Sequence, residues 1–318
     1  MEKSTGPGRG EAKAVLIAGP TASGKSALAA RLADALGGVI VNADSMQVYR
    51  ELRILTARPS AEEEAARPHR LYGHVSAAEA YSVARWLADV DGVLAEADQT
   101  GRTPIIVGGT GLYFTALVTG LSEVPEIPEA IRSYWRARGR ADGGAALHET
   151  LRERDPVMAE RLRPSDPQRI VRALEVMEAT GRSLADWQAE AAPPRLDPAR
   201  CHKVVLAPDR ADLRVRIETR FSQMLEEGAR EEVKALDRLD LDPALPAMKA
   251  IGVAPLLAHS MGLLSLEGAR DRAVADSARY AKRQETWFRN RFADWDRLDP
   301  AAIPETADGR WPWALAAS

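Results

Sequence analysis

The segment that decides the fold reads Gly19-Pro20-Thr21-Ala22-Ser23-Gly24-Lys25-Ser26, directly after the apolar run Val15–Ala18. It matches the phosphate-loop pattern G-x-x-x-x-G-K-[ST] in full, and the leucines of Ala27–Leu36 recur at the spacing of an amphipathic helix. This order of strand, loop and helix predicts backbone amides turned toward a diphosphate. The Lys25 ammonium would lie beside it, with the Ser26 hydroxyl as a ligand for Mg²⁺. A glycine-rich turn that happens to contain lysine is the alternative.

Alternating strands and helices surround this loop. Val39–Val41 and Pro104–Val107 are further buried strands, and between them Ser82 can cap a long helix that Gly101 ends. This alternation predicts an α/β fold with a parallel sheet, similar to a P-loop NTPase core. Beyond residue 121, prolines interrupt short helical pieces, and no strand is predicted before Lys203–Ala207. We therefore expect three segments: the first part of the core (1–120), a helical insertion domain (121–195) and the second part of the core (196–318).

Composition indicates an ordinary globular protein. The chain has 318 residues, 45% of them hydrophobic, and a formal net charge of −3, which suits about two domains. Because the chain as a whole is not basic, binding to nucleic acid would have to depend on local clusters. The polar N-terminus does not look like a signal peptide, no membrane span is predicted, and the single cysteine, Cys201, fits a reducing compartment. We expect a cytoplasmic monomer without a membrane partner.

A carboxylate is predicted beside the phosphate loop. An NTPase usually has an acid after a second buried strand. Here the strand Pro104–Val107 is followed instead by Gly108-Gly109-Thr110, without a carboxylate. Asp44 follows Val39–Val41 instead, and the carboxyl ends of parallel strands line one crevice. Asp44 is therefore the candidate general base, with a helix cap or turn residue as the alternative. The Thr110 hydroxyl could donate to a phosphate or a base, or the turn could be merely tight.

Local clusters of positive charge occur in three places. Arg279–Arg291 carries five basic residues against the single acid Glu285, with aromatic residues interleaved, a pattern that suits a phosphate backbone and stacked bases. The aromatic residues could equally be core anchors. Two pairs of arginines share a predicted helical face: Arg169 with Arg172, and Arg216 with Arg220. Each pair could clamp phosphate oxygens or belong to a solvated face.

Together these motifs resemble the tRNA dimethylallyltransferases (tRNA isopentenyltransferases) of bacterial type, which lack the zinc finger of the eukaryotic members. The matching segments follow the family's order over residues 15–292: Gly19–Ser26, Asp44–Tyr49, Val107–Phe114, Asp166–Glu175, Arg216–Phe221, Ala250–Gly252 and Ala281–Arg289. Two segments depart from the family pattern. Ile54–Pro59 has leucine and arginine where the family usually has glycine and lysine, and Val253 stands where tyrosine is common.

The resemblance implies transfer of a dimethylallyl group from dimethylallyl diphosphate, with Mg²⁺ as cofactor. The acceptor would be the exocyclic amine of the adenosine 3′ of the anticodon in tRNA. Catalysis would depend on Thr21, Lys25 and Asp44. The diphosphate would contact Gly19–Ser26, Arg169, Arg216 and Arg220. The implied tRNA contacts are Asp44, Ser45, Met46, Gln47, Thr110, Arg132, Gln168, Arg169, Ile170, Val171, Arg172, Lys249, Ala250, Ile251, Gly252, Val253, Ala254, Lys282, Arg283, Gln284, Trp287 and Arg289, those of the last group on C-terminal helices.

Two rival functions use the same loop. A small-molecule kinase would place ATP on Gly19–Ser26 and use Asp44 as the base for an acceptor hydroxyl. An RNA-binding sensor of nucleoside triphosphates would bind without transferring a group.

Overall fold

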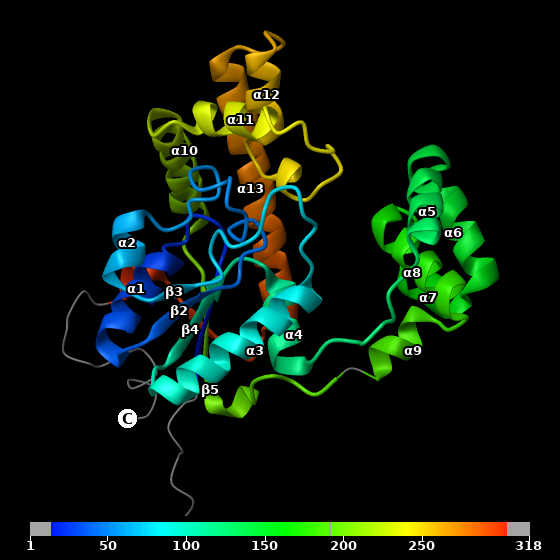
Figure 1. Cartoon of the computed structure of the whole chain (residues 1–318), viewed down its shortest axis with the longest axis horizontal. Coiled ribbons are helices and arrows are strands. Elements are labelled where there is room, and N and C mark those ends of the chain that lie inside the picture. Colours follow the sequence, from blue (N-terminus) through cyan, green and yellow to red (C-terminus); the bar gives the residue numbers. More distant parts are fainter. Residues whose placement is uncertain (1–13, 191, 304–318) are drawn as a thin grey trace, which may run out of the picture. The chain divides into compact units, whose positions relative to one another are not determined.

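The computed structural model describes residues 14–190 and 192–303. The chain divides into two compact units (Figure 1). One comprises the described residues up to Val118 and from Arg195 onward, and the other is Thr119–Pro194. The expectation that Met1–Lys13 is not a signal peptide lies outside the described residues.

The first unit is built on a six-stranded sheet whose neighbouring strands are all parallel, in the order β3-β2-β4-β1-β5-β6. The strands are β1 (Ala14–Ala18), β2 (Val39–Asn42), β3 (His69–Arg70), β4 (Pro104–Gly108), β5 (Cys201–Leu206) and β6 (Asp296–Leu298). Every residue of β1, β2 and β4 is buried, as expected for central strands covered on both faces. The predicted α/β fold with a parallel sheet is confirmed. Strands β3 and β6 were not predicted, because two or three residues are too few for a hydrophobic pattern.

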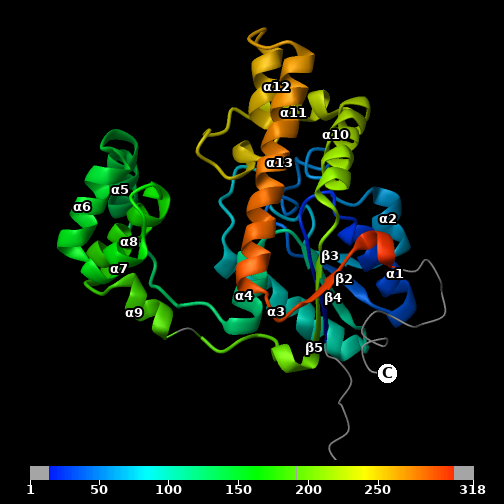
Figure 2. The ribbon, with the colours of Figure 1, turned by 180° about the vertical axis from the view of Figure 1, so that it is seen from behind.

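Eight α-helices of this unit surround or extend the sheet (Figures 1 and 2): α1 (Lys25–Leu36), α2 (Ala61–Ala66), α3 (Val83–Thr100), α4 (Gly111–Thr119), α10 (Arg210–Glu226), α11 (Ala229–Asp237), α12 (Val253–Ser260) and α13 (Leu266–Arg291). Three short 3-10 helices occur at Pro198–Arg200, Ala247–Lys249 and Pro300–Ala302. The Ser82 hydroxyl caps α3 by accepting the Arg85 amide, and Gly101 ends that helix with a positive φ of 64°. None of the helices described here is apolar over enough residues to cross a membrane.

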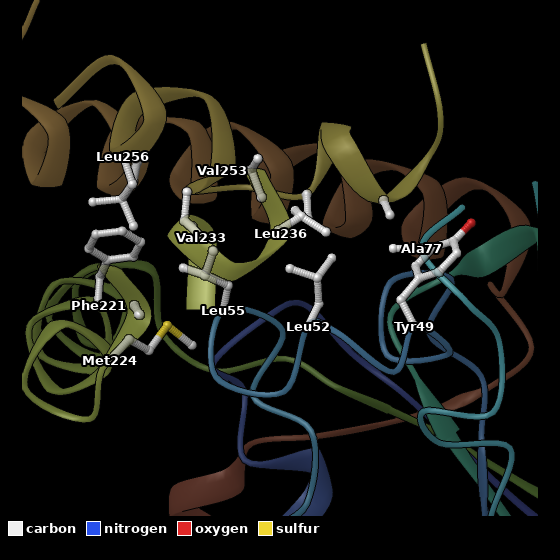
Figure 3. Close-up of a cluster of buried hydrophobic side chains, with 14 of the residues drawn as sticks. Tyr49, Leu52, Leu55, Ala77, Phe221, Met224, Val233, Leu236, Val253 and Leu256 are labelled. Carbon is white, nitrogen blue, oxygen red and sulfur yellow. The ribbon is translucent and has the colours of Figure 1, made fainter. Parts of the chain in front are cut away.

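In addition to the buried strands of the sheet, the first unit has a hydrophobic core that joins the C-terminal helices to the loop that follows β2. Figure 3 shows Leu52 and Leu55 of this loop among apolar side chains of α10, α11 and α12, including Phe221, Val233 and Leu256. The long helix α13 packs against α10 and α12, and Ala269 and Ala273 bring it into the same core. The loop after β2 is therefore held between the sheet and a helical layer.

The carboxylate of Glu232 fixes the same loop by polar contacts. Its oxygens accept the amides of Ile54, at 2.7 Å, and Leu55, at 3.3 Å. Burial raises the pKa of Glu232, and these backbone hydrogen bonds oppose the rise. The group is placed to satisfy amides that would otherwise be buried without partners.

We expect Glu232→Ala to lower the free energy of unfolding by about 1–3 kcal/mol, since it leaves these amides unsatisfied. Urea denaturation measures the effect. Glu231→Ala is the matched control, because Glu231 lies in the same first turn of α11 and is exposed. Equal losses for the two variants would show that the carboxylate does not hold the loop.

In the described residues of the second unit, all regular secondary structure is helical. It contains α5 (Glu129–Ala141), α6 (Gly143–Arg154), α7 (Pro156–Arg161), α8 (Pro167–Thr180) and α9 (Leu184–Ala189). Its core includes Trp135, Leu151 and Leu174. Asp155 and Asp166 cap α7 and α8, and each is followed by proline at the first helical position, where no backbone N–H is needed.

Candidate active site

The phosphate loop connects β1 to α1 in the conformation that its glycines allow. Gly24 has φ of 88°, a left-handed conformation that favours glycine. A side chain at Gly19 would come within 2.8 Å of the buried Ser23 hydroxyl. The Lys25 ammonium donates to the carbonyl of Pro20 at 3.2 Å. The loop therefore turns back over its own lysine at the start of a helix, where an anion is favoured.

The surroundings of Lys25 make its charge state sensitive to a bound anion. Burial lowers the pKa of its ammonium from 10.5 to about 8, the nearby charge of Asp44 opposes the change, and Arg220 adds to it. A bound diphosphate would favour the protonated form.

We expect the affinity of inorganic diphosphate to fall as the pH rises through about 8. Below that pH the lysine is already charged in the free protein, whereas above it binding must also take up a proton, which costs up to tenfold in affinity per pH unit. Calorimetry at several pH values measures the slope. In Lys25→Arg the arginine stays charged at every pH tested. The pH dependence that remains in this variant therefore reports titration of the diphosphate itself. A slope that is the same in both proteins would contradict the assignment.

Asp44 lies just beyond the end of β2 and is oriented by short-range hydrogen bonds. The Asn42 amide group accepts the Asp44 N–H at 2.8 Å and donates to the carbonyl of Asp44 at 3.0 Å. Carboxylate oxygen Oδ1 accepts the Met46 amide at 2.9 Å. No hydrogen bond to Oδ2 comes from the residues that the structure describes. One oxygen thus fixes the carboxylate, and the other is available to accept a proton.

The turn after β4 locks against the Asp44 segment. A Cβ atom at Gly108 would lie 2.1 Å from the Ala43 backbone, so this position requires glycine. A Cβ atom at Gly109 would lie 2.1 Å from the Gln284 side chain and would displace it. The Thr110 hydroxyl accepts the Ser45 amide at 2.9 Å, and the Thr110 amide donates to the Ala43 carbonyl at 3.2 Å. The turn is tight, and Thr110 ties it to the neighbouring strand end.

A cleft of about 790 Å³ opens over the phosphate loop. Its positively charged lining residues are Lys25, Arg53, Arg58, Arg67, Arg216 and Arg220. Arg216 Nη1 lies 3.9 Å from the position that a Gly24 Cβ would take. Burial lowers the pKa of Arg220, while Asp44 opposes this effect. The cleft thus offers arginines from α10 opposite the loop, which suits a ligand with several negative charges.

A smaller pocket of about 90 Å³ adjoins this cleft. Its apolar lining includes Met46, Leu55, Ile217, Phe221, Met224, Ala250 and Ile251. The two cavities share Thr21, Ala22, Asp44, Thr56, Arg220 and Met224. The phosphate loop, the Asp44 carboxylate and the half-buried Arg220 therefore meet where a charged cleft joins an apolar pocket.

Sequence reasoning missed the apolar pocket, as well as Arg53 and Tyr280 on the cavity walls. One signal for the pocket was present. Ile217, Phe221 and Met224 recur at the spacing of one helical face and share it with Arg220. Such a spacing indicates an amphipathic helix and does not by itself indicate a pocket.

The residues of helix α13 that are predicted to contact tRNA lie on two faces of the helix, one exposed and one buried. Lys282, Arg283 and Arg289 are exposed, while Gln284 is buried. The Trp287 indole nitrogen is buried without a partner among the described residues. The three exposed cations are available to a ligand at the surface.

The other predicted tRNA contacts vary in burial. Near α12, Lys249 and Ala254 are exposed, whereas Val253 and Gly252 are buried. In the second unit, Arg132 lies on α5 and Gln168–Arg172 on α8, with the side chains of Ile170 and Val171 buried. At buried positions a contact would have to be made by the backbone. All of these contacts stay predictions.

The oxygen ligands near the loop fit a magnesium ion bound mainly by its substrate. No group of three His, Cys, Asp or Glu side chains that could hold a metal occurs among the described residues. The Ser26 hydroxyl is exposed and lines the cleft together with Asp44. Mg²⁺ typically keeps several waters and binds through one or two protein oxygens plus phosphates.

Comparison with known proteins gives concordant matches. The family model described as IPP transferase matches residues 47–291, and that of isopentenyl transferase matches residues 12–77. The tRNA dimethylallyltransferase of Chelativorans sp. is 57% identical over 286 residues, covering 90% of this chain and 98% of the relative. That of Nitrobacter hamburgensis is 55% identical over 299 residues, covering 93% and 94%.

Solved structures agree with the sequence relatives. The tRNA isopentenylpyrophosphate transferase of Bacillus halodurans is 35% identical with a TM-score of 0.65, covering 91% of this chain and 90% of the other. A eukaryotic dimethylallyltransferase acting on tRNA is 27% identical with a TM-score of 0.75, covering 91% and 74%.

Proposed function

The chain belongs to the IPP transferase family, and from this premise we propose that it transfers the dimethylallyl group of dimethylallyl diphosphate to tRNA. The acceptor is the exocyclic amine of the adenosine 3′ of the anticodon, and diphosphate is released. The observation that carries the proposal is the junction of the charged cleft with the apolar pocket at Thr21, Asp44 and Arg220. The donor joins a diphosphate to a small branched hydrocarbon, and the two cavities accommodate these two chemistries side by side.

The reaction replaces a carbon–oxygen bond with a carbon–nitrogen bond. The bridging oxygen keeps the electron pair of the breaking bond, so the diphosphate gains negative charge as it leaves. Amides of the phosphate loop, Lys25, Arg216 and Arg220 stabilise that charge in a site partly shielded from water. The apolar pocket holds the five-carbon group with its reacting carbon at the junction.

Attack by the adenosine amine requires a base. The lone pair of this amine is delocalised into the ring, which makes it a weak nucleophile, and its proton must leave as the new bond forms. Oδ2 of Asp44 accepts that proton, since Oδ1 is already engaged by the Met46 amide. The adenosine must leave the stack of the anticodon loop, which costs a few kcal/mol and is offset by contacts in the site.

Mg²⁺ fits this scheme as a substrate-bound cofactor. The residue that would hold it is Ser26, together with oxygens of the donor diphosphate. It would supply additional neutralisation of the charge that develops on the leaving group.

The proposal extends to a cytoplasmic monomer, a location that would place the enzyme with tRNA. The kinase alternative lacks support, because the relatives described above are transferases of dimethylallyl or isopentenyl groups and a kinase would not need the apolar pocket beside Asp44.

An anticodon stem-loop oligonucleotide tests the acceptor directly. With dimethylallyl diphosphate and Mg²⁺, mass spectrometry should find one dimethylallyl group on the adenosine 3′ of the anticodon. The control oligonucleotide carries purine, which lacks the exocyclic amine, at that position and should stay unmodified. Modification of the control, or of another base, would refute this acceptor.

We expect the exposed face of α13 to bind tRNA through phosphates. Lys282→Ala combined with Arg283→Ala should reduce the log–log dependence of tRNA affinity on salt by somewhat under one unit per lost contact. It should also weaken matched and mismatched tRNAs alike, since phosphates carry no sequence information. Affinity measured across salt concentrations decides the point. An unchanged slope in a folded variant, or a loss confined to one tRNA sequence, would contradict it.

A further inference from the structure

Helix α13 carries a buried polar side chain that contacts both halves of the reaction centre. The side chain of Gln284 is only 5% exposed and lies in a stripe with buried Ala281 and Phe288. Its Oε1 accepts the Thr21 amide of the phosphate loop at 2.9 Å. Its Nε2 donates to the Gly109 carbonyl, in the turn after β4, also at 2.9 Å.

Position 284 requires a side chain that can accept one hydrogen bond and donate another. A backbone N–H can only donate and a carbonyl can only accept, so the orientation of the Gln284 amide is unambiguous. A carboxylate could accept from Thr21 but could not donate to Gly109. A Cβ at Gly109 would lie 2.1 Å from Nε2, so the glycine leaves room for this contact.

The two contacted segments hold the reacting groups. Thr21 is one of the residues at the junction of the charged cleft and the apolar pocket. On the other side, the position of a Gly109 Cβ lies 3.3 Å from Oδ2 of Asp44, and the adjacent Thr110 fixes the Ser45 amide. Gln284 therefore spans from the diphosphate cradle to the segment that carries the base.

We propose that Gln284 is a positioning residue for the transfer reaction: its amide fixes the separation between the Thr21 end of the phosphate loop and the Asp44 carboxylate. This inference depends on the proposed function. It gives Gln284 a role distinct from the tRNA contact that the family resemblance implies, because both ends of its amide are engaged inside the protein. The neighbouring Lys282 and Arg283 point their charge to the exposed face of the same helix, so α13 serves the acceptor on one side and the reaction geometry on the other.

Steady-state kinetics of Gln284→Met separates this role from tRNA binding. The variant keeps a similar length and loses both hydrogen bonds. We expect kcat to fall about 10²-fold, since a misplacement of about 1 Å between reacting groups costs that much. The KM values for dimethylallyl diphosphate and for tRNA should stay within about twofold. Asn290→Ala, exposed on the same helix, is the control for substitutions in α13 and should retain wild-type kcat.

Gln284→Glu gives the second test, and a folded state is verified for each variant by circular dichroism and tRNA affinity. This variant keeps the acceptor for Thr21 and, when ionised, loses the donor to Gly109, so its kcat should also fall. Wild-type kcat in either folded variant overturns the proposal. A raised KM for tRNA with unchanged kcat also overturns it, because Gln284 would then be a tRNA contact. If the wild-type protein transfers no dimethylallyl group, the proposed function itself fails, whatever the variants do.

Discussion

Asp44→Asn is expected to lower kcat by about 10²–10⁴-fold while tRNA affinity stays close to that of the wild type. The substitution preserves the shape of the side chain and an oxygen that can accept the Met46 amide, but it removes the basic group that receives the amine proton. Rapid-quench measurement of a single turnover reports the chemical step apart from product release.

The residual turnover of Asp44→Asn decides this assignment. Near-normal turnover by the variant would show that another group accepts the proton, or that water does so without assistance.

Arg220→Ala should give the second large loss, about 10²–10³-fold in kcat/KM for dimethylallyl diphosphate. Arg220 is half-buried at the junction of the two cavities, where its charge lowers the pKa of Lys25 and the charge of Asp44 opposes the lowering of its own pKa. A fixed cation at this position stabilises charge on the leaving diphosphate more strongly than on the intact donor, because charge accumulates only as the bond breaks.

The matched variant for this comparison is Arg214→Ala. Arg214 belongs to the same helix, is exposed and pairs with Glu218 at 3.1 Å, a surface ion pair that contributes little. Its loss should change kcat/KM by less than about twofold. Equal effects of the two substitutions would mean that Arg220 acts through the general charge of α10 and has no special place at the leaving group.

The sequence was sufficient wherever a local pattern determined the structure. The phosphate loop, the buried strands and the Ser82 cap each depend on residues that are close together in the chain, and the structure has them as predicted. Asp44 could be placed beside the loop because parallel strands end at one edge of a sheet. Both cavities include it in their lining.

Features that depend on distant contacts could not be predicted. Gln284 meets Thr21 across 263 positions of the chain, and no periodicity reports such a pairing. In the sequence, nothing distinguishes the buried Gln284 from the other residues of its basic helix. The apolar pocket likewise combines side chains from α10, α13, the loop after β2 and the segment before α12, and only the α10 face carries a recognisable spacing.

The most direct test of the transfer reaction is one incubation of the wild-type protein with dimethylallyl diphosphate labelled in its hydrocarbon part, γ-labelled ATP, Mg²⁺ and bulk tRNA. After separation of tRNA from small molecules, the hydrocarbon label should appear in the tRNA fraction and increase with time. It should be absent when the donor is replaced by an equally labelled dimethylallyl alcohol, which has no diphosphate to leave. Phosphate label that moves from ATP to a small molecule, with no hydrocarbon label in tRNA, would contradict the account and favour a kinase. Retention of both labels in their starting compounds would contradict any transfer function.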